Sequence, residues 1–497
     1  MRYFIRSLAL VCLLTASVWA QSTAPVLSQA IPAPELAQGG AAVTIDLRNY
    51  FAVPGLTAPP AGFTSIFPTG GGTPVITFTI DEGVPSVVSL VLSGSTLTVT
   101  PVGGGNGTIR IRAADREGRS ATASFAVTIS TSAPTFTLHP RALTVAPGGM
   151  VVLDATVVGA ATYRWERDGQ AVANGSSRVL VIPVVSASDA GNYRLVATSS
   201  LGTATSNPAQ LQVTTVAPQN MGRLSNLSIL TTAGAGEKVL TVGAVVGPLN
   251  ATGALPLIVR AVGPSLAAFS VPNLLPDPTM TFYAAGSSTS LDSNDNWGGS
   301  PALRTAFESV GAFALAGDSL DSAILRPLPG VGVGGYTVQV TGKGSSQGNV
   351  LAEIYDAAGS SRTGSAPRLI NVSTLTQVDV NADLAVGFVI AGQTAKTVLI
   401  RGAGPALTRL GVAGVMPDPR LELFDNSNSQ RISTNDDWSG ALEVGNAAVA
   451  VGAFPYASGT SKDAAIIVTL PPGPYSARLA GVGGVGGTAI VEVYEVP

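Results

Sequence analysis

The C-terminal half of the chain contains an internal duplication. The stretch Asp277–Trp297 (DPTMTFYAAGSSTSLDSNDNW) returns as Asp418–Trp438 (DPRLELFDNSNSQRISTNDDW), with both landmarks shifted by the same number of positions. Self-similarity at a fixed spacing indicates one folding unit that has been copied, so the two copies are predicted to share a fold. Copy one spans 223–356, copy two spans 368–497, and a Gly/Ser-rich linker at 357–367 joins them.

Length and composition favour several small β domains. At 497 residues the chain is too long for one core, since domains hold roughly 100–200 residues. Charged residues make up 11% of the chain against the ~25% typical of soluble domains, while Gly (58) and Pro (34) are abundant. This composition is typical of short strands joined by Gly- and Pro-rich turns. The predicted fold class is all-β, a string of four β-sandwich domains.

The N-terminus has the pattern of a secretory signal peptide. Two early arginines, an apolar run at Leu8–Leu14 and a small-residue cleavage site at Val18–Ala20 assign this role to residues 1–20. Residues 21–40, rich in Pro, Ala, Ser and Gln, are predicted to form an extended leader. No later stretch reaches the ~20 apolar residues of a membrane helix, so we expect a secreted or cell-surface protein whose mature chain has no membrane span.

Charge and cysteine content exclude several classes of partner and site. The formal net charge is -3 and no cluster of Lys and Arg occurs, which argues against nucleic-acid binding because phosphates demand a basic face. The single cysteine, Cys12, lies in the predicted signal peptide. The mature chain is therefore predicted to hold no disulfide and no thiolate metal site.

The segment 41–131 alternates apolar and polar residues as strands of a β-sandwich do. Its run LSGSTLTVTPVGGGNGTIRIRAADREGRSATASFAVTI resembles bacterial cadherin-like or immunoglobulin-like (Ig-like) repeats. The next segment, 133–214, has Trp165 in YRWERDGQ, and Asp189 and Tyr193 in SASDAGNYRLVAT. These residues resemble the strand C tryptophan and the tyrosine corner of the Ig fold, which implies structural roles for all three. The resemblance implies an Ig-like domain without its disulfide.

Each copy of the duplicated unit also alternates like strands. The order LxLxD, NDDW, LPxGxYxxxLxG and a final strand is similar to the bacterial pre-peptidase C-terminal module, which implies a jelly-roll-like β-sandwich. A helical turn is expected after each Gly-Pro pair, and short helices are expected near 302–310 and 441–449. The copies also look like repeats at the ends of large secreted bacterial proteins with Ig-like domains.

In both copies a loop rich in Asp and Asn lies just before the tryptophan that ends the duplicated stretch, Trp297 or Trp438. Its side chains are Asp292, Asn294, Asp295, Asn435, Asp436 and Asp437. Clustered carboxylates and amides supply the oxygen ligands that Ca²⁺ prefers, and calcium is the one cofactor that the sequence suggests. The alternative is that these side chains bond to the backbone of a tight turn.

Two arginines, Arg260 and Arg401, lie at the ends of apolar strands at equivalent places in the two copies. A buried guanidinium at such a strand end needs a carboxylate partner, and we expect Arg260 to pair with Asp277 and Arg401 to pair with Asp418 as structural ion pairs. Asp321 and its counterpart in copy two are the alternative partners.

Trp297 and Trp438 follow the acidic loops. An exposed indole ring could stack on a sugar, whereas a buried ring would fill the edge of the core. These residues are therefore the candidate ligand-binding residues of the two copies.

No catalytic arrangement is recognisable, so we predict that the protein is not an enzyme. The chain has one histidine for any Ser-His-Asp or Cys-His site, and its Gly-rich stretches at 330–335 and 481–487 lack the Lys of a phosphate-binding loop. The leading hypothesis is a rod of modules with an adhesion, binding or spacer role toward an extracellular protein or polysaccharide. Alternatives are a carbohydrate-binding protein using Trp297 and Trp438 with calcium-ordered loops, or an accessory region of a secreted hydrolase system.

Overall fold

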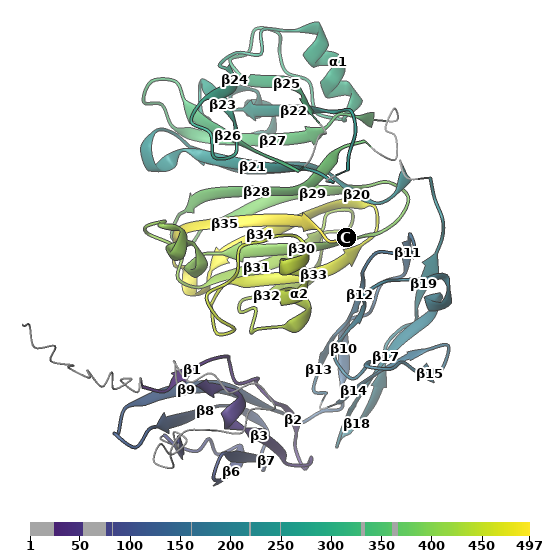
Figure 1. Cartoon of the computed structure of the whole chain (residues 1–497), viewed down its shortest axis with the longest axis vertical. Helices are drawn as coiled ribbons and strands as arrows, with labels where there is room; N and C mark the ends of the chain where they lie inside the picture. Colours follow the sequence, from purple (N-terminus) through teal and green to yellow (C-terminus); the bar gives the residue numbers. More distant parts are fainter. Residues whose placement is uncertain are drawn as a thin grey trace, which may run out of the picture.

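The computed structural model describes residues 24–52, 76–81, 83–160, 162–217, 220–248, 250–329, 333–359 and 366–497. The predicted signal peptide at 1–20 lies outside the described residues. The described chain is almost entirely β-structure and forms a string of β-sandwich domains, as predicted (Figure 1). Within the described residues, no helix has the length and apolarity needed to cross a membrane.

The N-terminal domain packs a four-stranded sheet, β2-β9-β8-β5, against a three-stranded sheet, β3-β7-β6. Its strands are β1 (Val26–Leu27), β2 (Glu35–Ala37), β3 (Val43–Asp46), β4 (Phe51–Ala52), β5 (Thr77–Ile80), β6 (Val88–Ser93), β7 (Thr96–Pro101), β8 (Gly105–Ala114) and β9 (Ser120–Ser130). Buried and exposed residues alternate along β8 and β9, since successive side chains of a strand point to opposite faces. Ile109, Phe125 and Val127 are among the buried residues of this core.

The Ig-like domain packs the sheet β11-β19-β17-β14-β15, with β18 attached to β17, against the strand pair β12-β16. Its strands are β10 (Thr135–Leu138), β11 (Leu143–Val145), β12 (Val151–Asp154), β13 (Thr156–Val158), β14 (Thr162–Arg167), β15 (Gln170–Ala171), β16 (Val179–Ile182), β17 (Gly191–Ser199), β18 (Gly202–Thr205) and β19 (Ala209–Val213). Trp165 on β14 is fully buried at the centre of its hydrophobic cluster. Apolar packing of Ala155 and Leu195 occupies the positions where Ig domains carry cysteines.

Each copy of the duplicated unit contributes eight strands and one short helix. Copy one contains β20 (Arg223–Ala233), β21 (Leu240–Gly247), β22 (Ala254–Val262), β23 (Pro278–Ala284), β24 (Ser290–Asn294), α1 (Pro301–Ser309), β25 (Ser322–Pro329), β26 (Gly334–Gly342) and β27 (Gly348–Asp356). Copy two contains β28 (Arg368–Val378), β29 (Asp383–Ala391), β30 (Lys396–Ala403), β31 (Pro419–Asp425), β32 (Gln430–Asn435), α2 (Leu442–Ala450), β33 (Ala464–Leu470), β34 (Gly473–Gly481) and β35 (Gly487–Glu495). Both predicted helices are present.

The two copies are joined by strand pairs between their facing edges. The first strand of copy one, β20, pairs with its own last strand β27 and with β29 of copy two. The first strand of copy two, β28, pairs with its own last strand β35 and with β21 of copy one. The result is two continuous rows, β25-β22-β27-β20-β29-β34-β31-β32 and β24-β23-β26-β21-β28-β35-β30-β33, and one hydrophobic cluster runs through both copies (Figure 1).

The sequence permits this pairing between the copies because a glycine faces a serine at each junction. A Cβ at Gly243 would stand 2.5 Å from the Oγ of Ser373 in copy two, and one at Gly387 would stand 2.5 Å from the Oγ of Ser228 in copy one. Glycine at these two places gives the neighbouring strand the room to approach. The junctions are reciprocal, so the copies are joined by two equivalent interfaces.

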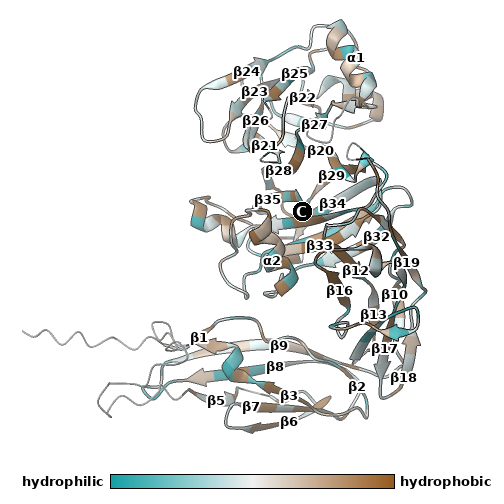
Figure 2. Cartoon of the chain, turned by 45° about the vertical axis from the view of Figure 1, so that its right-hand side comes forward, coloured by the Kyte–Doolittle hydropathy of each residue, from teal (hydrophilic) through white to brown (hydrophobic). Residues whose placement is uncertain are grey.

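The modules do not follow one another as the linear rod that the sequence suggested. The chain doubles back, so that copy two lies beside the Ig-like domain, with copy one above it and the N-terminal domain below it (Figures 1 and 2). The Ala395 N–H donates to the Thr144 carbonyl at 2.7 Å, and the Met150 N–H donates to the carbonyl of the last residue, Pro497, at 3.2 Å. Copy two therefore contacts three other modules, since a Cβ at Gly459 would also meet Gln29.

Candidate functional site

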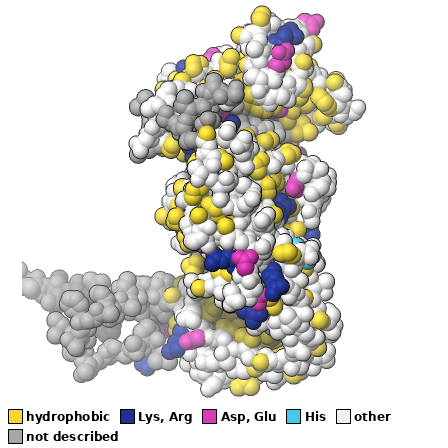
Figure 3. All heavy atoms as spheres, turned by 90° about the vertical axis from the view of Figure 1, so that its right-hand side faces the viewer, with side chains coloured by type: hydrophobic (Ala, Val, Ile, Leu, Met, Phe, Trp, Pro, Cys, Tyr) yellow, Lys and Arg dark blue, Asp and Glu magenta, His cyan; other side chains and the backbone are white. Residues whose placement is uncertain are grey.

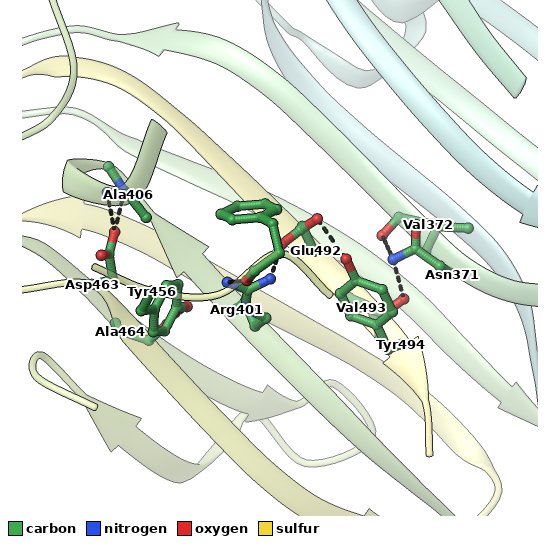
Figure 4. A network of polar contacts seen from close by, with 12 residues as sticks. Asn371, Val372, Arg401, Ala406, Tyr456, Asp463, Ala464, Glu492, Val493 and Tyr494 are labelled. Carbon is green, nitrogen blue, oxygen red and sulfur yellow. Dashed lines mark hydrogen bonds and ion pairs between the residues drawn. The ribbon is translucent and has the colours of Figure 1, made fainter. Parts of the chain in front are cut away.

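A buried cluster of one arginine, one glutamate and one tyrosine occurs at the same place in both copies. Arg260 on β22 and Arg401 on β30 are 0% and 1% exposed. The Nη1 of Arg401 donates to Oε2 of Glu492 at 3.0 Å, and the hydroxyl of Tyr494 donates to the other oxygen of that carboxylate at 2.7 Å (Figure 4). Burial of these charges is tolerated because each has a partner of opposite charge and further hydrogen bonds.

Copy one repeats the cluster with one difference in geometry. The Nε of Arg260 lies 3.0 Å from Oε2 of Glu353, although its N–H does not point along the contact. Tyr355 donates to Oε1 of Glu353 at 2.6 Å. Burial raises the pKa of Glu353 and of Glu492, and the nearby guanidinium opposes that rise in each copy.

Aromatic rings cover the arginines. The guanidinium carbon of Arg260 lies 4.7 Å from the centre of the Phe307 ring and 4.4 Å from that of Phe313. The guanidinium carbon of Arg401 lies 4.2 Å from the ring centres of both Phe454 and Tyr456. These distances are within the ~6 Å of a cation–π contact. The rings therefore attract the guanidinium charge and also shield it from water.

The predicted pairing of the arginines with aspartates is wrong. Asp277 and Asp418 instead lie near lysines, 3.5 Å from Nζ of Lys343 and 3.8 Å from Nζ of Lys462. Strand register gives the reason: Glu353 stands directly opposite Arg260 across the β22–β27 pair, as Glu492 does opposite Arg401. The sequence did hold a signal for this partner, because the last strand of each copy has a Glu two positions before a Tyr, at Glu353 in AEIYD (352–356) and at Glu492 in VEVYE (491–495).

The alternative partners, Asp321 and Asp463, hold a backbone turn instead. The Oδ1 of Asp321 accepts the Gly263 N–H at 2.8 Å, and the Oδ1 of Asp463 accepts the Gly404 N–H at 2.9 Å. Each glycine precedes a 3₁₀ helix, η5 (Pro264–Phe269) or η7 (Pro405–Leu410), at the predicted helical turns. A buried carboxylate therefore satisfies the free N–H groups at the start of each turn.

Side chains of the acidic loops bond to the backbone and to basic residues. The Oδ1 of Asn294 accepts the Ala323 N–H at 3.0 Å, and its counterpart Asn435 accepts that of Ala465 at 2.8 Å. Asp292 lies 3.4 Å from Nη1 of Arg326. The two Asn side chains tie the loop to the following strand, which is the turn interpretation of this motif.

A lysine ammonium stands among the aspartates of each loop. Nζ of Lys343 is 2.9 Å from Asp295, and Nζ of Lys462 is 2.8 Å from Asp437. Lys343 comes from the β26–β27 turn and Lys462 from the segment before β33, so the two lysines reach equivalent places from unrelated positions. Within the described ranges, no group of three or more His, Cys, Asp or Glu could hold a metal ion. Calcium binding by Asp292, Asn294, Asp295, Asn435, Asp436 and Asp437 stays a prediction, and the lysines favour the turn.

The two candidate tryptophans differ in exposure. Trp297 is 3% exposed, and its indole N–H donates to the Ala316 carbonyl at 2.9 Å. A ring so buried fills the core edge and has no face for a sugar. Trp438 also donates, to the Ser458 carbonyl at 3.0 Å, but this residue is only partly buried.

The Ig-like residues take the roles that the resemblance implied. The indole N–H of Trp165 donates to the Ser177 carbonyl at 3.0 Å, and the Tyr193 hydroxyl donates to the Asp189 carbonyl at 2.8 Å. Asp189 also accepts the Ser186 N–H at 2.8 Å through its side chain. These bonds form a tyrosine corner.

Comparison with known proteins supports an Ig-like domain at this place. Residues 134–213 match the family model of the immunoglobulin I-set domain. No curated protein matches the sequence.

Among solved structures, similar chains include a chimeric titin Z1Z2 carrying a decorin peptide (21% identity, 39% of this chain and 99% of that chain, TM-score 0.18). The N-terminal Ig1-2 module of the Drosophila receptor protein tyrosine phosphatase DLAR is also similar (19%, 39% and 100%, TM-score 0.16). A three-Ig titin fragment shares 11% identity over 75% of this chain and 95% of its own, with a TM-score of 0.16.

Proposed function

We propose that the chain is a non-enzymatic secreted or cell-surface protein that binds an extracellular protein or polysaccharide and holds its binding surfaces in fixed positions. The observation that carries this proposal is the reciprocal strand pairing of the two copies. Backbone hydrogen bonds along β20–β29 and β21–β28 leave no flexible joint between the copies, since bending there would break the sheet.

The Ig-like domain extends this rigid body. The Thr469 hydroxyl accepts the Val152 N–H at 2.8 Å, and the Thr397 hydroxyl donates to the Met150 carbonyl. Arg141 of the Ig-like domain also lies 3.5 Å from Asp425 of copy two. We call these contacts the docking seam. A docked domain presents its loops in a set orientation, which suits a protein that binds or spaces rather than one that closes on a substrate.

The chain's one histidine is engaged in structure. The Nδ1 of His139 accepts the Asn207 N–H at 3.1 Å, and its ring stacks on Phe136 with centres 5.5 Å apart.

The face of the molecule in Figure 3 carries scattered charged side chains among uncharged ones. Weak contacts with such uncharged faces gain strength when several modules act together.

Carbohydrate binding is the second candidate, and the partial exposure of Trp438 favours it. Such a role would rest on copy two alone, because the Trp297 ring is buried.

The test is to immobilise the purified chain and measure its binding to panels of extracellular proteins and polysaccharides by interferometry, beside chromogenic assays for hydrolases. We expect saturable binding to at least one partner without turnover. Turnover that follows the folded chain, or the lack of saturable binding to every member of both panels, would contradict the proposal.

A further inference from the structure

The strand β6 of the N-terminal domain has an open edge. Within the residues that the structure describes, β6 pairs with β7 alone. The Val87 carbonyl, just before β6, accepts the Val102 N–H on the β7 side. Because successive residues of a strand direct their backbone groups to alternate sides, the N–H and C=O of Leu90 and Leu92 point to the open side. Unpaired backbone groups in such a row are a template for another strand.

The composition of β6 does nothing to block such pairing. The strand reads VSLVLS, with no charge and no proline over its six residues. Other edges of the chain are protected: β25 contains Pro327, β32 contains Arg431, and β33 is engaged by the Ig-like domain through Thr469. Proline, charged side chains and a covering domain are the devices that keep edge strands apart. The open edge of β6 carries none of the three among the described residues.

The side chains of β6 match those of a second β6 strand. Leu90 and Leu92 pack on the core of the N-terminal domain and are only partly buried, whereas Val91 points outward and is 59% exposed. In an antiparallel pair with Val91 opposite Val91, each Leu90 lies opposite a Leu92 of the other chain. Ser89 then lies opposite Ser93. Apolar residues meet apolar ones, and no like charges face each other.

The place of β6 in the molecule leaves room for a second chain. The strand lies at the end of the molecule, on the side of the N-terminal domain that faces away from the Ig-like domain and from both copies (Figures 1 and 2). A second molecule that approaches this end therefore meets the N-terminal domain first.

We propose that β6 pairs with β6 of a second copy of this chain, in an antiparallel register centred on Val91. The pairing joins the two β3-β7-β6 sheets into one and links two molecules end to end. The inference goes beyond the proposed function, because it holds whichever partner the chain binds. A dimer would carry every binding surface twice, which strengthens weak contacts. An extended segment of another protein is the competing occupant of this edge.

The test measures the mass of the chain without residues 1–20 by sedimentation equilibrium at several concentrations. We expect a monomer–dimer equilibrium with a Kd on the order of 10 µM, because one strand pair makes a small interface. Val91→Lys and Val91→Glu should each raise this Kd about tenfold or more, since like charges then face each other. An equimolar mixture of the two variants should dimerise again. Val91→Thr is the matched control and should dimerise as the original chain does.

A single cysteine tests the register. Without residues 1–20 the chain has no cysteine, so a disulfide of a single-cysteine variant joins two chains. Val91→Cys should cross-link on mild oxidation, because the two Cβ atoms of a directly opposed pair lie close together. Ser89→Cys is the matched control and should not cross-link, because Ser89 faces Ser93 of the other chain. Equal cross-linking of both variants would contradict the proposed pairing.

A mass of one chain at every concentration would overturn the inference, and so would a dimer that Val91→Lys leaves intact. Loss of a panel partner when Val91→Lys is made in a monomeric chain would assign the edge to that partner and would also overturn it. If Val91→Lys is monomeric and still binds the partners found in the panels, the inference and the proposed function both stand. If the chain dimerises through β6 but binds no panel member, the inference stands and the proposed function fails.

Discussion

Copies one and two build the same buried cluster from different positions. In copy one a ring over Arg260 comes from the helix, at Phe307. In copy two the equivalent helix residue is Ala448, and the ring over Arg401 comes from Tyr456 in the loop that follows. Each guanidinium therefore has two rings against it, while the position that supplies one of them differs between the copies.

The copies also differ at their outer edges. Thr397 and Thr469 face each other across β30–β33 and bond to the Ig-like domain, whereas Pro256 and Pro327 face each other at the same place in copy one. Proline has no N–H and hinders further strand pairing at an edge. The Ig-like domain therefore docks on copy two, where these two threonines can bond to it, and not on copy one, which has prolines there.

The largest effect is expected from breaking the buried ion pair. Replacing Glu492 with alanine would leave Arg401 buried without its carboxylate and should lower the free energy of unfolding by about 3–5 kcal/mol. Chemical denaturation measures it. Glu353→Ala should cost less, because the Arg260 N–H is not aimed at its partner. The double change Arg401→Met with Glu492→Leu should restore much of the loss, and a double variant as unstable as Glu492→Ala would contradict this account.

A smaller effect is expected at the docking seam. Thr469→Ala removes the acceptor of the buried Val152 N–H and should cost about 1–3 kcal/mol of docking. Hydrogen exchange at β12 would report it as lost protection. Pro327→Thr in copy one is the matched control and should leave exchange at β12 unchanged. Unaltered protection in Thr469→Ala would show that the hydroxyl does not hold the domain.

Lys343 and Lys462 should contribute little to stability. Their ammonium groups should take the place of a calcium ion beside the aspartates. Lys462→Met should cost less than about 1 kcal/mol, as exposed ion pairs do. We expect a chelator to leave the melting temperature of the original chain unchanged. A rise in melting temperature with added calcium would contradict the role given to Lys343 and Lys462.

Two aspartates that lie near these lysines, Asp295 in copy one and Asp418 in copy two, should respond to pH with opposite signs. Hydrogen bonding to Lys343 lowers the pKa of Asp295, so its stabilising effect is present above the unfolded pKa and is lost on acidification through the folded one. Burial raises the pKa of Asp418, so its stabilising effect is present at low pH and is lost as pH rises through the folded value. Carboxyl NMR titration of both residues tests this, and a pKa of Asp418 below that of Asp295 would contradict it.

Sequence reasoning succeeded where the signal is local. The duplicated stretch, the tyrosine corner at Tyr193 and the burial of Arg260 at a strand end follow from patterns over a few residues. The partner of Arg260 was missed because Glu353 meets it only through the register of β22 and β27, which lie far apart in the chain.

The strand pairing between the copies could not be predicted from the alternation of apolar and polar residues. An apolar face on β20 or β28 is buried equally well against a strand of its own copy or of the other copy. The docking seam was hidden for a related reason, because Thr397 and Thr469 are ordinary strand residues until they face Val152 and Met150.

The most direct test of the shared sheets compares copy two alone, residues 366–497, with both copies together, residues 220–497. The account predicts one cooperative thermal transition for the pair. It predicts no stable monomer for the single copy, because β28 and β29 would lose their partners β21 and β20. A monomeric 366–497 fragment that melts cooperatively at the temperature of the pair would contradict it.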